Sequence, residues 1–148
     1  MSAIEIRKLA PADHEAAVKL LGHLNPSIPT EVLAQRFTTI LEEHPHYHAF
    51  GAFTEGKMTG LASAWIATKV WCGKYLELDN LVVDPSLRSS GVGSALIRHL
   101  EEFARAEGCN LAVLDSYTSN HASHRLYHRL GFEIWGFHFV KAFGPLDR

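Results

Sequence analysis

The stretch "LDNLVVDPSLRSSGVGSALI", Leu78 to Ile97, joins an apolar run typical of a strand to a run with helical spacing. Gly91 and Gly93 fall at the junction, where a missing Cβ lets the backbone come close to a ligand. The first N–H groups of a helix have no internal partners, and together with the helix dipole they favour an anion. This stretch therefore predicts either an ordinary turn or a cradle for phosphate oxygens.

The flanking sequence predicts an α/β domain. Strands are expected at 3–9, 46–54, 58–68, 75–85 and 111–115, with terminal β structure at 132–143, and helices at 11–24, 30–41, 91–108 and 120–131. We expect Asp13 and Thr30 to cap the first two helices. The short loop 55–57 indicates a hairpin, whereas the unit 75–115 indicates a parallel pair, so the sheet is mixed. We predict one domain, 1–148, with about six to seven strands and about four helices.

The strand at 75–85 has an unusual alternation. Leu76, Leu78 and Val82 share one parity, while Glu77, Asp79, Leu81 and Val83 share the other. A regular strand would place two acids and two aliphatic side chains on one face. The pattern favours either a bulge that re-aims the side chains partway along or a strand that leaves the core.

Composition excludes several classes of protein. The chain has 148 residues, 47% of them hydrophobic, and a net charge of -2, which gives no electrostatic case for nucleic acid or for an anionic membrane. No apolar run approaches the ~20 residues of a membrane span. Cys72 and Cys109 match no metal or redox spacing, and the first ten residues lack a signal-peptide core. We expect a cytoplasmic protein.

Two other phosphate-binding motifs fit poorly. A Walker loop needs a Gly-Lys-Ser/Thr ending that is absent here. The dinucleotide fingerprint begins at Gly91-Val92-Gly93 and has Asp115 at a suitable distance, but its third small position falls on Leu96. A dinucleotide is therefore disfavoured.

The stretch instead resembles the acyl-CoA-binding segment of the GNAT superfamily of N-acetyltransferases. That pattern, Arg/Gln-x-x-Gly-x-Gly/Ala after a strand ending in Val-x-Pro, is filled by Arg88, Gly91 and Gly93. A second segment, "SNHASHRLYHRLGF" at 119–132, resembles the last helix of the family. It matches at Asn120, Ser123, Leu126, Tyr127, Gly131 and Phe132. The resemblance covers roughly 75–143, and the earlier residues agree only in the order of strands and helices.

The resemblance implies acetyl-CoA as acyl donor, held between strands 75–85 and 111–115, which splay apart. Amides from Ser89 to Ser94, across Ser90, Gly91, Val92 and Gly93, would bind its diphosphate, with Arg88 beside it. Leu81, Val82 and Val83 would pair with the pantetheine amides as a sheet edge does with an added strand. Asn120 and Ser123 would contact the same arm, although Asn120 is equally suited to cap its helix.

The resemblance also suggests the catalytic groups. Tyr127 would protonate the departing thiolate, since a phenol with a pKa near 10 stays protonated at pH 7; otherwise it is a packing tyrosine. Glu77 falls where several members carry a catalytic base, with Asp79 or a water chain as alternatives. Asp79 and Asp115 are candidate substrate contacts. No cysteine lies in the matched motifs, which favours direct transfer without an acyl-enzyme.

Three questions stay open. His44, His46 and His48 alternate and would suit zinc on one strand face, but Pro45 interrupts them, so we expect no metal.

Trp65, Trp71 and Tyr75 either line the acceptor pocket or pack in the core. The acceptor is expected to be a small-molecule primary amine; a protein N-terminus, a protein lysine or a non-catalytic acyl-CoA sensor are the alternatives. A homodimer is common in the family.

Overall fold

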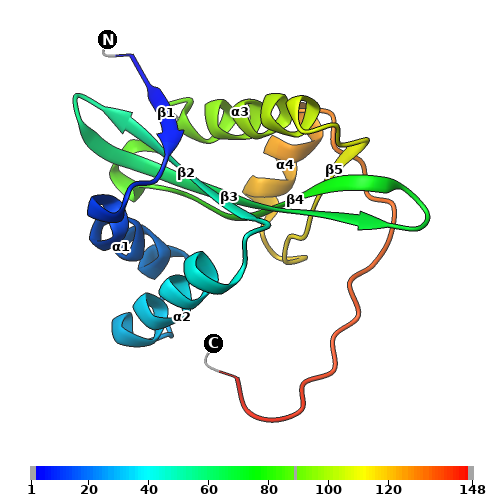
Figure 1. Ribbon diagram of the computed structural model, residues 1–148, viewed down its shortest axis with the longest axis horizontal. Helices are drawn as coiled ribbons and strands as arrows, with labels where there is room; N and C mark the ends of the chain where they lie inside the picture. Colours follow the sequence, from blue (N-terminus) through cyan, green and yellow to red (C-terminus); the bar gives the residue numbers. More distant parts are fainter. Residues whose placement is uncertain (1–2, 89, 147–148) are drawn as a thin grey trace.

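A computed structural model describes residues 3–88 and 90–146. In this part of the chain a five-stranded sheet lies between helices on both of its faces (Figure 1). The strands are β1 (Glu5–Lys8), β2 (Tyr47–Thr54), β3 (Lys57–Lys69), β4 (Gly73–Val83) and β5 (Leu111–Leu114). The helices are α1 (His14–Leu24), α2 (Thr30–Glu43), α3 (Val92–Ala106) and α4 (His121–Arg129), with short 3-10 turns η1 (Pro11–Asp13) and η2 (Pro85–Leu87).

The sheet is mixed, as the sequence predicts. Its order is β1-β2-β3-β4-β5, antiparallel from β1 to β4 and parallel between β4 and β5. The β2–β3 hairpin turns at Glu55 and Gly56, whose φ angles of 51° and 78° match the turn that the twist of a hairpin favours. The parallel strands β4 and β5 are joined by a crossover connection that contains α3.

A bulge interrupts β4 where the alternation of the sequence breaks. The β3–β4 register steps from Leu61 opposite Val82 to Ser63 opposite Asp79, which leaves one extra residue on β4. Asn80 takes the left-handed conformation there, with φ 52°. Its side-chain amide donates to the Tyr47 hydroxyl and to Ser63 Oγ, each at 3.3 Å. The predicted bulge is confirmed and is held by side chains from two neighbouring strands.

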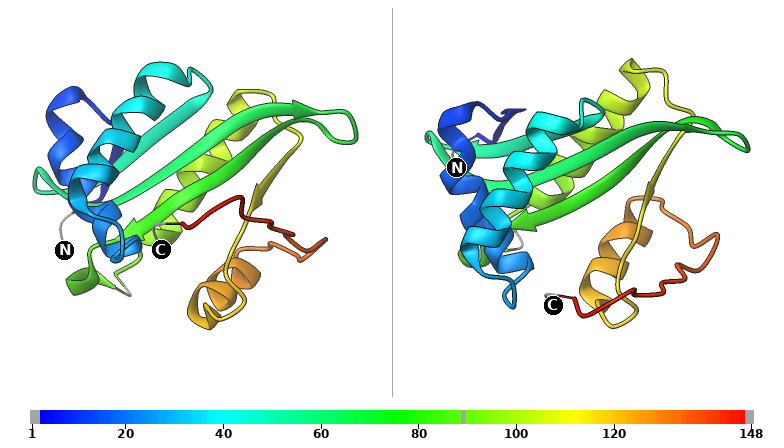
Figure 2. Two further views of the ribbon diagram at one scale, coloured as in Figure 1. Left: turned by 90° about the horizontal axis from the view of Figure 1, so that it is seen from below. Right: turned by 60° about the horizontal axis from the view of Figure 1, so that its bottom comes forward.

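Each face of the sheet has its own core. On one face α1 and α2 pack over Leu61 and Val82; on the other α3 packs over Leu76 and Leu78. Leu96, Ile97 and Leu100 of α3 are almost fully buried, and each such side chain contributes roughly 1.5–3 kcal/mol of transfer free energy. Figure 2 shows β5 diverging from β4 toward α4, so the two parallel strands stay side by side over a short length.

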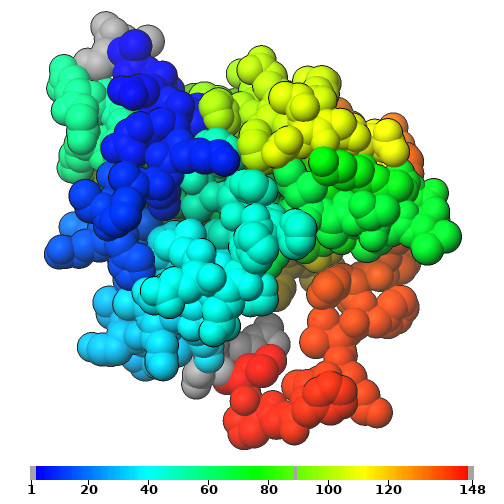
Figure 3. Space-filling view, in the orientation of Figure 1, coloured from blue at the N-terminus to red at the C-terminus, as the bar shows by residue number. Residues whose placement is uncertain are grey.

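The predicted strand count of six to seven is wrong: residues 132–146 form no strand, and the sheet has five strands in the described part of the chain. A strand exists only where its backbone pairs with a neighbour, and this segment, which we call the C-terminal arm, touches the body through side chains at Trp71 and Asp115 and extends beyond the sheet (Figure 3). β5 is half-buried rather than buried, because its far edge lacks a covering strand.

The expected caps of the first two helices also differ. Thr30 is the first residue of α2, and Pro29 occupies the cap position. Asp13 precedes α1 without a side-chain cap bond, because its carboxylate instead accepts from Arg7 and from the Ala10 amide, each at 2.7 Å. No helix of the described residues is long and apolar enough to cross a membrane.

Candidate active site

The start of α3 presents free backbone donors. Gly91 precedes the helix with φ 88°, a conformation that glycine adopts without strain. Ala95 is the first residue whose N–H reaches a carbonyl, that of Gly91, at 3.0 Å. Within the described residues the N–H groups of Val92, Gly93 and Ser94 therefore remain available to a ligand. A Cβ at Gly91 would meet no atom within 4 Å, so this corner is open.

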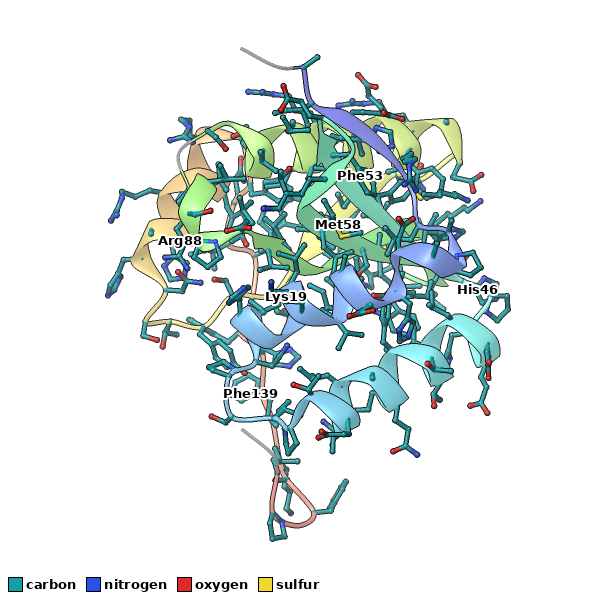
Figure 4. All side chains as sticks on the ribbon, turned by 90° about the vertical axis from the view of Figure 1, so that its left-hand side faces the viewer. Lys19, His46, Phe53, Met58, Arg88 and Phe139 are labelled. Carbon is teal, nitrogen blue, oxygen red and sulfur yellow. The ribbon has the colours of Figure 1, made fainter. Side chains whose placement is uncertain are left out.

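The three residues predicted to bind the diphosphate just before α3, residues 88–90, differ in what the structure shows of them. Ser90 donates its hydroxyl to the Leu87 carbonyl, which closes the turn just before α3. Arg88 is exposed and lies at the molecular surface in the loop that leads to α3 (Figure 4). Ser89, predicted to offer its amide, lies outside the described residues.

Three elements meet at Gly93. A Cβ there would lie 3.7 Å from Val83 at the end of β4 and 3.9 Å from Leu126 of α4. β4 pairs with β5 only from Tyr75 to Leu78, so residues 79–83 have a β3 neighbour on one side and a free edge on the other. Leu81 and Val83 are half-buried along this edge, while Val82 is buried against the α1 and α2 side. The predicted splay is thus present, with the start of α3 at its end.

The last helix carries two predicted residues. Asn120 caps α4, since its side chain accepts the Ser123 N–H at 3.4 Å; this is the capping alternative that the sequence left open. Tyr127 is half-buried, with its ring 6.0 Å from that of Phe132. Burial raises the pKa of the Tyr127 phenol, and an interaction with Ser123 partly offsets this. The phenol therefore stays protonated at neutral pH.

Glu77 lies one residue before the point where β4 and β5 separate, directly opposite Trp65 of β3. Its side chain is half-buried. Burial raises the pKa of the Glu77 carboxyl, the charges of Asp115 and Asp79 raise it further, and Lys69 and His138 act in the opposite sense. A carboxylate whose pKa lies above its usual range is better matched to accepting a proton near neutral pH.

The other two predicted acids have partners. Asp79 accepts the Trp65 indole N–H at 3.0 Å with one oxygen and the Asn80 amide at 2.9 Å with the other. Asp115 is exposed, and its carboxylate lies 3.5 Å from Nδ1 of His138 in the C-terminal arm. Asp79 therefore shapes the bulge, and Asp115 lies at the edge of the splay.

Sequence reasoning missed the group that fixes the bulge. Tyr47, Ser63 and Asn80 come from three strands and carried no motif. The parity break in β4 signals that a bulge exists, but it gives no indication of which distant side chains hold it.

The three alternating histidines do not share a strand face. His44 follows the last residue of α2, His46 precedes β2, and only His48 lies in a strand. The His44 ring contacts Trp65 and the His48 ring contacts Phe103. Figure 4 places His46 on the opposite side of the molecule from Arg88. Among the described residues no cluster of three or more His, Cys, Asp or Glu side chains is arranged to hold a metal ion.

The fold and the site together have the features of an acyl-CoA-dependent transferase: a mixed sheet split at its parallel pair, with free backbone amides of a helix start at the split. The chain matches the model of the acetyltransferase (GNAT) family over residues 15–132 and belongs to that family. It is therefore an N-acetyltransferase that uses acetyl-CoA.

Three similar proteins illustrate the family. Glucosamine 6-phosphate N-acetyltransferase of Trypanosoma brucei brucei is 32% identical over 133 residues, which cover 87% of this chain and 88% of that protein. Aminoalkylphosphonate N-acetyltransferase of Salmonella typhimurium is 28% identical, covering 96% and 93%. The solved structure of aminoglycoside N-acetyltransferase AAC(6')-Iy in complex with CoA superposes with a TM-score of 0.85 at 26% identity, over 97% of each chain.

Proposed function

We propose that this chain, as a single domain, transfers the acetyl group of acetyl-CoA directly to the primary amine of a small molecule. The observation that carries the proposal is the meeting of free amides at the start of α3 with the free edge of β4 and with α4. A small acceptor is supported by the relatives, whose names specify an amino sugar phosphate, an aminoalkylphosphonate and aminoglycosides.

The donor site uses the helix start as an anion site. Amides of residues 90–94 bind the diphosphate, aided by the helix dipole, and Arg88 supplies a countercharge at the surface. Leu81, Val82 and Val83 offer strand-edge backbone groups to the pantetheine amides. Asn120 and Ser123 flank that arm from the first turn of α4; because the Asn120 oxygen already accepts from Ser123, its side-chain NH2 is the group left to donate.

The chemistry requires three proton movements. An alkylamine with a pKa near 10.4 is neutral at pH 7 only at a cost of about 4.6 kcal/mol, and Glu77 accepts that first proton. As the amine nitrogen bonds to the acetyl carbon, the carbon–sulfur bond breaks and the thiolate takes the Tyr127 phenolic proton. The acetylated nitrogen then releases its second proton to solvent, and solvent reprotonates the Tyr127 phenolate. Neither cysteine suits an acyl-enzyme: Cys72 lies in the β3–β4 turn, and burial raises the pKa of the Cys109 thiol.

The test is a panel of small primary amines assayed for release of free CoA thiol, with N-acetyl product identified by mass spectrometry. The proposal expects stoichiometric thiol and acetylated amine with at least one acceptor. Binding of acetyl-CoA without turnover across the panel would instead support a sensor, and acetylation of peptides alone would move the acceptor class to protein amines.

We also propose a homodimer in the cytoplasm. The C-terminal arm exposes Trp135, Phe137, Phe139 and Phe143, each at 75% or more. Aromatic side chains bury about 150–250 Å² each, so two arms together bury on the order of 1,200–2,000 Å², the size of a stable interface. The open β5 edge of a second copy of the chain is a surface to which such an arm can bind. A cytoplasmic location is supported by the fact that both cysteines are free.

Light scattering after gel filtration tests the dimer. Phe139→Lys in the arm should yield a monomer, whereas Val70→Lys, at the equally exposed β3–β4 turn, should leave the dimer intact. A wild-type monomer at tens of micromolar would contradict the dimer without affecting the acetyltransferase proposal.

A further inference from the structure

A hollow of about 540 Å³ lies between the end of α2 and strands β3 and β4. Its lining combines the carboxylates of Glu43 and Glu77 with the rings of His44, Trp65 and Tyr75. Glu77 is also the proposed base, so this hollow adjoins the point where the strands separate. An amine that enters this hollow therefore meets Glu77.

The aromatic wall of the hollow is fixed in place. The Trp65 ring contacts Tyr47 at 4.8 Å and His44 at 5.4 Å between centroids, and its indole N–H is held by Asp79. A ring held on several sides offers its remaining face to a ligand without losing rotamer freedom. Trp65 is half-buried, so part of that ring faces the hollow.

The neighbouring ring already meets a cation. Lys69 Nζ lies 4.9 Å from the centroid of Tyr75, within the range of a cation–π contact. An ammonium group from a ligand has the same chemistry and finds Trp65, the better aromatic partner for a cation, in the same hollow.

The charges of the hollow are also unfavourable to an anion. The exposed Glu43 and the half-buried Glu77 both line it, and the charges of Asp79 and Asp115 act on Glu77 as well. Lys69 and His138 act on Glu77 in the opposite sense, and each already has a partner: Lys69 lies over the Tyr75 ring and His138 lies beside Asp115. A phosphate in this hollow would lie against carboxylates.

We infer that this hollow selects an acceptor with several amino groups and no phosphate or phosphonate. One amine approaches Glu77, and a second ammonium lies between Glu43 and the rings of Trp65 and Tyr75. The inference rests on the proposed acetyl transfer and names its substrate class. It assigns Glu43, which touches no reacting atom, to acceptor specificity.

Three sugar amines test it: glucosamine, glucosamine 6-phosphate and neamine, which differ in phosphate and in number of amines. Wild-type kcat/KM should be at least about tenfold higher for neamine than for glucosamine, and lowest for the phosphate. Glu43→Gln should raise the KM for neamine about tenfold, with a smaller effect on glucosamine. Glu42→Gln is the matched control, because Glu42 is on the same helix end but does not line the hollow.

Calorimetric binding of the same amines separates this inference from acetyl transfer. If Glu43→Gln weakens neamine binding and Glu42→Gln does not, the result supports acceptor selection by the hollow. This holds even if no thiol is released, because the absence of thiol would contradict only the proposed acetyl transfer. Preference for glucosamine 6-phosphate, or identical behaviour of the two glutamine variants, overturns the inference. Loss of activity toward glucosamine 6-phosphate in Lys74→Met would also overturn the inference. Lys74 lines the adjoining hollow of about 560 Å³, so that loss would make Lys74 a phosphate-binding residue of the acceptor site.

Discussion

The indole Nε1 of Trp65 donates a 3.0 Å hydrogen bond to Oδ2 of Asp79, across the β3–β4 pair. The second oxygen of Asp79 accepts the Asn80 amide at 2.9 Å, so both oxygens serve the bulge that frees the edge of β4. This relationship favours a positioning role for Asp79, in keeping with Glu77 as the proposed base.

Asp79→Ala should therefore lower stability more than it affects proton transfer. Removing the carboxylate leaves the partly buried Trp65 N–H without its acceptor, at a cost of about 1–3 kcal/mol. Urea denaturation measures this loss, and the KM for acetyl-CoA should rise because residues 81–83 shift. A stable variant with normal KM and a collapsed kcat would instead make Asp79 the base.

Glu77→Gln should reduce kcat by roughly 10²–10⁴-fold, the range for a general base, with little change in the KM for acetyl-CoA. Because the pKa of Glu77 is raised above its ordinary value, wild-type kcat should fall as pH drops through that raised pKa and protonates the base. The variant should lack this acid limb. An acceptor of low amine pKa, already neutral at pH 7, should narrow the gap between the two enzymes; an undiminished gap would argue against proton removal by Glu77.

Tyr127→Phe should lower kcat by about 10²–10³-fold while calorimetry shows unchanged acetyl-CoA affinity. The ring and its contact with Phe132 are kept, so folding is expected to be unaffected, and thermal denaturation checks this. Wild-type kcat in the phenylalanine variant would reduce Tyr127 to a packing residue.

Gly60→Ala should weaken acetyl-CoA binding by displacing α3, which packs directly over Gly60 of β3. A Cβ at Gly60 would come 2.8 Å from Val92 Cγ1 and 3.0 Å from Leu96 Cδ1, so the first turn of α3 must move. Overpacking of this kind costs about 1–3 kcal/mol, and the KM for acetyl-CoA should rise. Gly22→Ala is the control: nothing lies within 4 Å of its Cβ in α1, and it should stabilise by about 0.5–1 kcal/mol. If the two variants had equal KM values for acetyl-CoA, the position of α3 would not determine acetyl-CoA binding, and this prediction would be wrong.

Local signals in the sequence predicted most of this arrangement. Glycines at 91 and 93 between a strand and an amphipathic run predicted the start of α3, and the parity break after Leu78 predicted the bulge at Asn80. Both depend on neighbours in the chain. The Asn80 contacts with Tyr47 and Ser63 join residues 33 and 17 positions apart, so local patterns do not reveal them.

The C-terminal arm shows the opposite limit. Its alternation of aromatic and polar residues is that of a strand, yet it pairs with no neighbour among residues 3–88 and 90–146. A period of two gives strand propensity, whereas strand formation needs a partner that the pattern does not specify. His44, His46 and His48 alternate as residues of one strand would, yet they share no strand face, because α2 ends at Glu43 and β2 begins only at Tyr47.

The central claim is that backbone amides at the start of α3 bind the diphosphate of the acyl donor. The most direct measurement is calorimetric titration of the wild-type protein with acetyl-CoA and with acetyl-pantetheine, which carries the same thioester without the diphosphate. The account predicts that acetyl-CoA binds at least tenfold more tightly, about 1.4 kcal/mol, and that Gly91→Glu abolishes this difference. Equal affinity for both ligands, or an undisturbed difference in the glutamate variant, would contradict it.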